Sequence, residues 1–359
     1  MANKQRNSAG DNVSTWRDVL TAVLRIPGEK ERIAKELSCH SASVTRWAQG
    51  PTTPAPQRLF ALRDALPEAF QEEFSALLEQ ERRVQQYSGK AKESVPAHVP
   101  ASVYDLVLDS WSQAPDVRRY WEVSRVILKH AVEQLDPGKV GMEISIVRCM
   151  PPTKHVVRSL REDICIGTSP WSEEVGYKSL LVGSESQAGY VVTTTLPSVI
   201  QDTEDPHGLV PLRKGFYKRS AAAYPIIRQG KIAGCLSAVC TLPKYFTAGH
   251  RGILQTYAKM CVLAFEPEDF FSSTQIDLRE MPPDEDQLPF FAQFLQWRLD
   301  AIREADRKRE HLSTRAAENR AWMRLEDALL DYTRQESERA EPKQQRDSHL
   351  VELQDVPSR

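Results

Sequence analysis

The chain has 359 residues and a formal net charge of −2, from 47 Lys and Arg against 49 Asp and Glu. Its 41% hydrophobic residues can form ordinary cores, and its length predicts two or three domains of roughly 100–200 residues each. The near-neutral charge excludes a polybasic coat over the whole chain, but an average can hide one basic domain. Residues 1–66 fit that description, with ten Lys and Arg against six Asp and Glu.

The apolar residues and the cysteines indicate a compartment. No apolar run approaches the ~18 residues that span a bilayer, and the polar start MANKQRNSAGDN lacks the basic flank and apolar core of a secretory signal. We therefore expect a cytoplasmic protein with no membrane partner. The six cysteines form no C-x-x-C pair and are too sparse for a disulfide framework, so we expect most of them to be small buried thiols: Cys39, Cys149, Cys165, Cys235, Cys240 and Cys261.

Three changes in composition divide the chain. Residues 88–100 are small, charged and proline-bearing, which is typical of a linker. Residues 271–289 are rich in acid and proline, and from about Arg334 the chain is charged and almost free of apolar residues. The expected parts are a helical domain at 1–67, a helix and linker at 68–100, a mixed domain at 101–270, an acidic linker at 271–288, a helical segment at 289–333 and a disordered tail at 334–359.

The first part shows apolar residues at three- or four-residue spacing, which predicts helices at residues 14–24, 29–37, 41–48 and 57–66. Ser38, Cys39 and His40 form a tight corner between the second and third helices. Val44 and Trp47 anchor the third helix against the second. The side of the third helix that begins at Ser41 is therefore left facing outward.

The stretch ERIAKELSCHSASVTRWAQG, residues 31–50, resembles the helix-turn-helix of the Cro/repressor (XRE) family of transcriptional regulators. That resemblance implies that the third helix enters the major groove of a double-stranded DNA operator. It places His40, Ser41, Ala42 and Thr45 toward base edges, and Lys35, Arg46 and Gln49 near phosphates. Ser38 occupies a turn position where the family commonly has glycine, so the turn must tolerate a side chain. The alternative is a helical bundle that binds proteins and not DNA.

The middle part mixes helices and strands. Its patterns predict helices at residues 116–135 and 248–265 and strands at 140–149, 154–160, 222–227 and 231–240. Strands bracketed by helices indicate an α+β domain with one antiparallel sheet and flanking helices. The expected fold class is thus multi-domain: an all-α domain, this α+β domain and a C-terminal helix.

Residues 121–266 resemble a GAF domain, and three stretches carry the resemblance: AGYVVTTTLPSVIQDTEDP, KRSAAAYPIIRQGKIAGCLSAVC and FTAGHRGILQTYAKMCVLAFE. The resemblance implies a sensor of small molecules or a dimerisation module. A cavity would lie over the small residues 220–223, roofed by a helix at 191–196 and by an insertion at 162–185 that acts as a lid. The expected pocket residues are Trp171, Tyr177, Val191, Asp202, Ser220, Ala222 and Tyr224.

The identity of a ligand is left open. The signature of cyclic-nucleotide-binding GAF domains is not evident, and the middle part has no Cys-His pair to attach a linear tetrapyrrole. The histidines lack metal-ligand spacing, so we expect no metal and no cofactor. Small anions stay possible because basic residues crowd this part of the sequence: Arg148, Arg158, Arg161, Arg213, Lys214, Lys218 and Arg219.

GAF-like domains include free methionine sulfoxide reductases, which use cysteines, and five of the six cysteines lie in this part. Catalysis would need an exposed thiolate with a resolving partner. Cys235 and Cys261 lie in apolar contexts, so we expect packing roles, no catalytic residue and no enzyme activity.

Residues 288–333 favour a helix, with Phe290, Phe294 and Trp297 at helical spacing. The helix is expected to pack on the sensor or on its copy in a partner chain. A homodimer is the natural expectation, since paired helix-turn-helix units read two half-sites. A ligand would then alter dimer geometry, and with it the spacing of the recognition helices, through residues 68–100.

Overall fold

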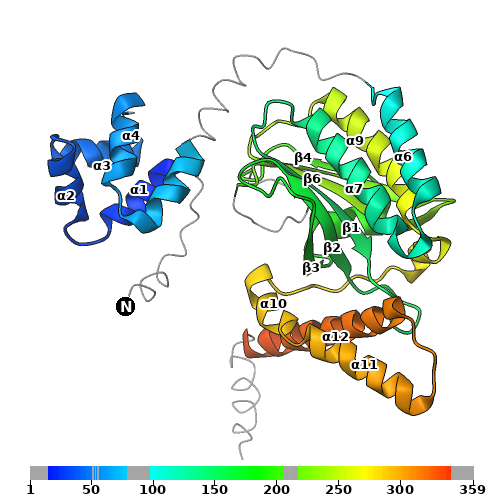
Figure 1. Ribbon diagram of the computed structural model, residues 1–359. Helices are drawn as coiled ribbons and strands as arrows, with labels where there is room; N and C mark the ends of the chain where they lie inside the picture. The colour runs from blue at the N-terminus through cyan, green and yellow to red at the C-terminus, as the bar shows by residue number, and fades with distance from the viewer. Residues whose placement is uncertain are drawn as a thin grey trace, which may run out of the picture.

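The computed structural model describes residues 15–50, 52, 54, 56–78, 98–205, 210 and 217–340. Three parts follow one another along the chain: an N-terminal helical domain, a middle domain built on one sheet, and C-terminal helices below the sheet in the view of Figure 1. This arrangement confirms the expected fold class. In the described part of the chain, no helix is both long and apolar enough to cross a membrane.

The N-terminal domain contains α1 (Trp16–Leu24), α2 (Glu29–Glu36), α3 (Ser41–Gln49) and α4 (Pro56–Ala65), and residues 68–78 are also helical. A capping box fixes the start of α1, because Thr15 and Asp18 each bind the other's backbone N–H. The fully buried side chains of the core include Leu20, Ile33 and Leu62. These helices agree with the sequence prediction to within one or two residues.

The sheet of the middle domain has six antiparallel strands in the order β3-β2-β1-β6-β5-β4. The strands are β1 (Met142–Cys149), β2 (Leu160–Gly167), β3 (Gly176–Val182), β4 (Ser198–Ile200), β5 (Ser220–Arg228) and β6 (Lys231–Cys240). β1 and β6 lie at the centre, and β1 is buried along almost its whole length. This strand order makes β3 one edge of the sheet.

Helices cover both faces of the sheet. On one face lie α6 (Ala101–Gln113), α7 (Asp116–Leu135) and α9 (Ala248–Cys261), and they enclose the largest core (Figure 1). On the other face α8 (Gln187–Thr194) packs on a smaller core that includes Val147, Leu160 and Cys235. Three short 3-10 helices follow α9: η1 (Val262–Ala264), η2 (Pro267–Asp269) and η3 (Ser273–Gln275).

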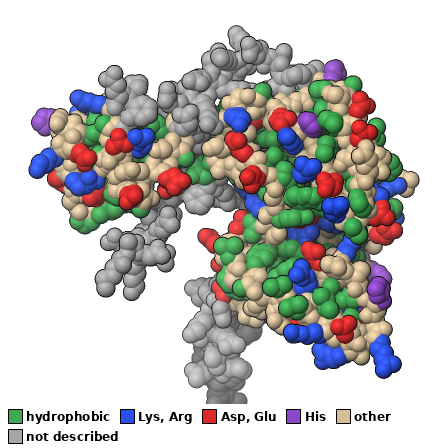
Figure 2. All heavy atoms as spheres, viewed as in Figure 1, with side chains coloured by type: hydrophobic (Ala, Val, Ile, Leu, Met, Phe, Trp, Pro, Cys, Tyr) green, Lys and Arg blue, Asp and Glu red, His purple; other side chains and the backbone are tan. Residues whose placement is uncertain are grey.

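The C-terminal part is three helices and not the single helix that was expected: α10 (Asp284–Phe291), α11 (Phe294–Lys308) and α12 (Thr314–Ala340). Arg309, in the left-handed conformation with φ of 53°, ends α11. α12 continues to Ala340, so the expectation of disorder from residue 334 is wrong for residues 334–340, and residues 341–359 lie outside the described residues. Hydrophobic side chains gather on the visible face of this part (Figure 2).

The C-terminal helices pack on the β3 edge, as expected for a segment that contacts the sensor. Leu181 of β3 and Met150 lie in one core with Trp322, Leu325 and Leu329 of α12. Gln287 of α10, which is fully buried, donates to Leu181 O at 2.7 Å and accepts from Leu181 N at 2.9 Å. The amide side chain thus continues the hydrogen-bonding of an edge strand.

Two expectations for the middle domain are wrong. The strand expected at 154–160 begins only at Leu160, and the insertion expected as a lid at 162–185 contains most of β2 and the whole of β3. Charged side chains in β2 hid its pattern. Their charges are paired, since Arg161 contacts Asp163 at 2.8 Å and Lys178 of β3 contacts Glu162 at 2.9 Å.

The helix expected at 191–196 starts and ends earlier, as α8. Ser186 caps its first turn by accepting from Gly189 N, and Thr195 ends it in the left-handed conformation. The expected linker at 88–100 falls almost wholly outside the described residues, as does the end of the helix expected before it from residue 68.

Candidate functional site

The corner between α2 and α3 is closed by backbone hydrogen bonds. Ser38 N donates to Lys35 O at 3.1 Å and Cys39 N donates to Ala34 O at 2.9 Å. Ser38 itself has a φ of 47°, which is the left-handed region that favours glycine. The side chain that the sequence analysis singled out is therefore accommodated, because Ser38 points into solvent.

α3 has one buried and one open side. Val44 and Trp47 are buried in the N-terminal core, whereas Ala42, Arg46 and Gln49 are exposed at helical spacing on the opposite side. His40 just before α3 and Lys35 of α2 are exposed too, while Ser41 and Thr45 are half-buried. All seven residues that were predicted to face DNA thus have solvent-accessible surface, five of them on α3 and the other two on α2 and just before α3.

The contacts of this surface leave its cation accessible. Among the described residues Arg46 makes only a long contact, 3.5 Å to Ser43 Oγ, whereas Arg32 on α2 is held by Glu29 and Glu36. Thr45 Oγ1 donates to Ser41 O at 3.1 Å. Figure 2 shows Lys and Arg side chains interspersed with acidic ones over the N-terminal domain. Arg46 is therefore an exposed cation on the outer side of α3.

The structure does not bring the seven expected pocket residues together. Ala222 and Tyr224 lie in the core under α7 and α9, whereas Val191 lies with Ala223 on the opposite face of the sheet. Neighbouring residues of a strand point to opposite faces of the sheet. Ala223 therefore faces Val191, whereas Ala222 and Tyr224 face the other way and cannot line a cavity with it.

The other four expected pocket residues lie elsewhere. Ser220 is fully buried and donates to Leu242 O at 2.6 Å, and Asp202 forms an ion pair with Arg219. The rings of Trp171 and Tyr217 meet edge to face. Tyr177, on β3, lines a pocket at the edge of the sheet.

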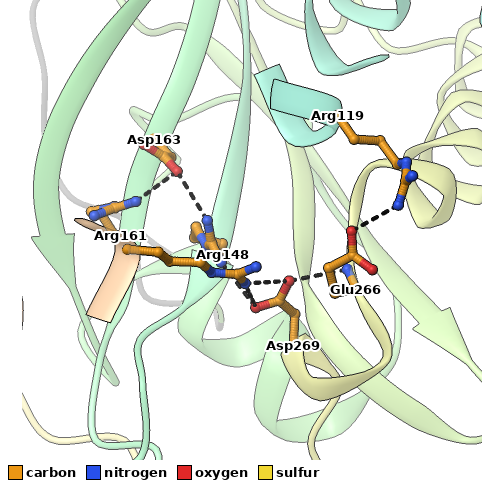
Figure 3. Close-up of polar contacts among 7 residues, drawn as sticks. Arg119, Arg148, Arg161, Asp163, Glu266 and Asp269 are labelled. Atoms are coloured by element: carbon orange, nitrogen blue, oxygen red, sulfur yellow. Dashed lines mark hydrogen bonds and ion pairs between the residues drawn. The ribbon is translucent and has the colours of Figure 1, made fainter. Parts of the chain in front are cut away.

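A cluster of charged side chains lies instead where β1 and β2 approach η2. Arg148 of β1 is placed between two carboxylates, with Nη1 3.7 Å from Asp163 Oδ2 and Nη2 3.1 Å from Asp269 Oδ1 (Figure 3). Arg161 contacts the same Asp163 oxygen at 2.8 Å. Arg315 of α12 contacts Asp269 at 2.8 Å. Three guanidinium groups thus share two carboxylates.

Burial sets the electrostatics of the cluster. Asp163 is 1% exposed. Desolvation alone would lower the pKa of Arg148, but nearby Tyr120, Asp269 and Asp163 raise it above its usual value. Burial raises the pKa of Tyr120 as well, and the charge of Asp163 adds to that effect. Arg148 is therefore a permanent cation whose charge is held inside the domain.

The cluster extends to the helices of the main core. Arg119 of α7 contacts Glu266 at 3.0 Å, and the backbone N–H of Glu266 donates to Asp269 at 3.1 Å (Figure 3). Arg148 lies over the ring of Tyr120 at 4.6 Å. The sequence analysis singled out Arg148 and Arg161 but missed the other three residues. Tyr120 lies in a segment read only as a helix, Asp163 in a segment read as an insertion, and Asp269 after the last helix expected in the middle domain.

The cysteines are in environments that disfavour thiolates. Burial raises the pKa of Cys149 to about 12 and of Cys165 to about 11. It raises the pKa values of Cys235, Cys240 and Cys261 above the usual thiol range too. Cys149, Cys235, Cys240 and Cys261 are buried, which confirms the expectation for these four, and Cys39 and Cys165 are half-buried. Within the described ranges, no three His, Cys, Asp or Glu residues are grouped so as to hold a metal ion.

A known protein family matches the middle domain. Residues 123–265 match the GAF domain family, so the chain contains a GAF domain. No curated protein sequence matches the chain.

Several solved structures are similar to this chain at low sequence identity. A type II free methionine-R-sulfoxide reductase from Thermoplasma acidophilum is 12% identical over 43% of this chain and 99% of its own, with a TM-score of 0.31. The GAF domain of a phosphoenolpyruvate-protein phosphotransferase from Coxiella burnetii is 15% identical, and the match covers 45% of this chain and 89% of that domain's chain with a TM-score of 0.32. A putative GAF sensor protein from Burkholderia vietnamiensis is 14% identical, and the match covers 46% of this chain and 89% of the sensor protein's chain with a TM-score of 0.29.

Proposed function

We propose that this chain is a DNA-binding transcriptional regulator in which α2 and α3 form a helix-turn-helix and the GAF domain senses a small molecule or mediates dimerisation. The observation that carries the proposal is the outer side of α3, which is open to solvent while Val44 and Trp47 hold its inner side. Such a helix fits the major groove, where its first residues reach base edges and basic neighbours grip phosphates.

Selection of bound genomic DNA fragments by the purified full-length chain tests this proposal. One fragment should be enriched repeatedly and should bind in a mobility-shift assay. Thr45→Ala should change which sequences are selected, because Thr45 is among the residues proposed to face bases, whereas Arg46→Ala should weaken binding to all of them. Lys129→Ala is the matched control, since Lys129 is an exposed cation of α7 in the GAF domain. If no fragment is enriched at low salt, the reading of α3 as a recognition helix is wrong and a protein-binding role takes its place.

We propose further that the chain is a homodimer, because paired recognition helices read half-sites roughly 34 Å apart. α6 supports a helical interface: Tyr104, Leu108 and Trp111 follow one another at helical spacing and are 40%, 51% and 43% exposed, while Val107 on the other side is buried. Exposed apolar stripes of this kind mark interaction surfaces. Leu108→Glu should reduce the mass measured by light scattering to that of a monomer, and an unchanged mass would exclude α6 from the interface.

We propose that the GAF domain does not act as a thiol enzyme. The support is the set of raised thiol pKa values, since the thiolate is the reactive form of cysteine. In the native chain the five cysteines of the GAF domain should therefore react with iodoacetamide at pH 7.5 far more slowly than in the chain unfolded in guanidinium. The native chain should not reduce free methionine sulfoxide with dithiothreitol as reductant. Turnover in that assay would overturn this proposal and leave the DNA-binding test unaffected.

A further inference from the structure

A pocket of about 290 Å³ lies between the β2–β3 edge and the C-terminal helices. One wall consists of Arg161, Asp163, Tyr177 and Ser179, and the other of Phe291, Phe294, Glu318 and Trp322. Ligand pockets commonly have volumes of roughly 300–1,000 Å³, so this one fits a molecule with a single ring. It lies at the sheet edge, away from the α8 face on which the sequence analysis placed a cavity.

The walls are mainly aromatic. Trp322 packs against Phe294 with ring centroids 4.5 Å apart and against Phe291 at 6.2 Å. On the opposite wall, Tyr177 stacks on Trp121 of α7 at 4.8 Å with an interplanar angle of 27°, which holds its ring in place. Aromatic side chains fixed in this way offer faces and edges to a flat ring.

Arg161 supplies an unused cationic donor at the pocket. Its Nη2 donates to Asp163, and its guanidinium lies 4.2 Å from the centre of the Trp322 ring. Among the described residues no acceptor binds Nη1, and none binds the buried Nε. Buried polar groups are normally hydrogen-bonded, and bonds from a guanidinium to an anionic oxygen are the strong ones.

The carboxylates at the pocket are unequal. Asp163 is shared by Arg161 and Arg148, so its charge is already compensated. Glu318 lies on the α12 wall and accepts from Trp322 Nε1 at 3.4 Å. Arg161 therefore favours an anion at the sheet wall, while Glu318 alone favours a cation at the helix wall.

We propose that this pocket binds a small aromatic carboxylate, whose carboxylate accepts from Arg161 Nη1 and whose ring lies among Phe291, Phe294 and Trp322. A ligand in this position contacts the sheet edge and the C-terminal helices at once, so it stabilises their docking. That this ligand regulates the protein rests on the proposed sensor role, whereas its binding to the pocket is measured without DNA. The failure of one proposal is thus distinguishable from the failure of the other.

Titration calorimetry on the full-length chain tests the site with benzoate, with acetate as an anion that lacks a ring, and with benzyltrimethylammonium as a cation that has one. Benzoate should bind, and acetate should not. Arg161→Gln should weaken benzoate binding roughly 10-fold or more, the effect of losing one charge-assisted hydrogen bond. Arg228→Gln, which removes an exposed guanidinium at the far end of β5, should leave it unchanged.

Glu318→Gln separates the two charge preferences while it keeps the shape of the wall. It should strengthen benzoate binding, because a negative charge near the anion is removed. The proposal would be overturned if the cation bound more tightly than benzoate and if Glu318→Gln weakened that binding of the cation. It would also be overturned if benzoate did not bind at about 10 mM. Matching melting temperatures for the variants and the native chain show that any loss of binding by Arg161→Gln is not a loss of fold.

Discussion

Gln287→Met tests how the C-terminal helices are held to the GAF domain. Gln287 is fully buried, and its amide donates to Leu181 O and to Pro282 O at 2.9 Å while it accepts from Leu181 N. Methionine has a similar volume but replaces none of these bonds. A buried group that loses its partner costs about 1–3 kcal/mol, and three backbone groups lose one, so the substitution should destabilise this contact by about 3 kcal/mol or more.

Hydrogen exchange measured by mass spectrometry, together with urea unfolding, reports this change. Peptides from β3 and α10 should exchange much faster in Gln287→Met, while peptides from β1 and β6 at the centre of the sheet should not change. Gln296→Met is the matched control, because Gln296 is exposed on α11 and its side chain bonds to the neighbouring Asp300 of the same helix. Equal exchange of β3 in Gln287→Met and in the native chain would refute the view that this amide holds the edge strand.

Three further substitutions test local features. Gly234→Ala should destabilise the GAF domain by about 3 kcal/mol or more in urea unfolding, because the added Cβ would lie 2.0 Å from Val147 O. Gly230→Ala is the control: Gly230 also has a positive φ but lies in open space, so the substitution should cost only about 1 kcal/mol. Equal costs for the two substitutions would contradict the close approach of Gly234 to Val147. Ser38→Gly should raise the stability of the N-terminal domain slightly, by under about 1 kcal/mol, since it relieves the left-handed conformation at φ 47°; a large loss of stability on thermal unfolding would argue against this turn.

Burial lowers the pKa of His250 to about 4. Below about pH 6.5 this histidine therefore becomes protonated in the unfolded chain while it stays neutral in the folded chain. Stability is then fully present above pH 6.5 and falls as the pH decreases toward 4, by about 1–2 kcal/mol between pH 7 and pH 5. His250→Gln should remove that part of the pH dependence in urea unfolding, and an unaltered dependence would contradict it.

Local signals predicted most of the fold. Apolar spacing located α1 to α4, α7 and α9 because each helix buries one stripe, and the small and apolar strands β5 and β6 were recognised for the same reason. β2 and β3 were missed because their charged side chains are satisfied by partners from other elements, such as Glu143 for Lys178 at 2.9 Å. Such pairing depends on tertiary structure and leaves no periodic pattern in the sequence.

The same limit applies to the sites. The surface of α3 was predictable because all its residues come from one short stretch with a recognisable turn. The pocket at the sheet edge joins Arg161 to Trp322 across 160 positions of the chain, so it depends on how α12 docks on β3. Arg161 was visible in the sequence as one of several cations, but Phe294 was seen only as a helix-packing residue and Trp322 was not singled out.

The salt dependence of DNA binding tests the central claim most directly. For a selected fragment, a plot of log Kd against log salt concentration should be linear, and its slope should fall by about one for Arg46→Ala and for Lys35→Ala, since each loses one phosphate contact. Lys129→Ala should keep the native slope. A slope that is the same in all four proteins, or an affinity that salt does not change, would contradict a duplex bound along the open side of α3.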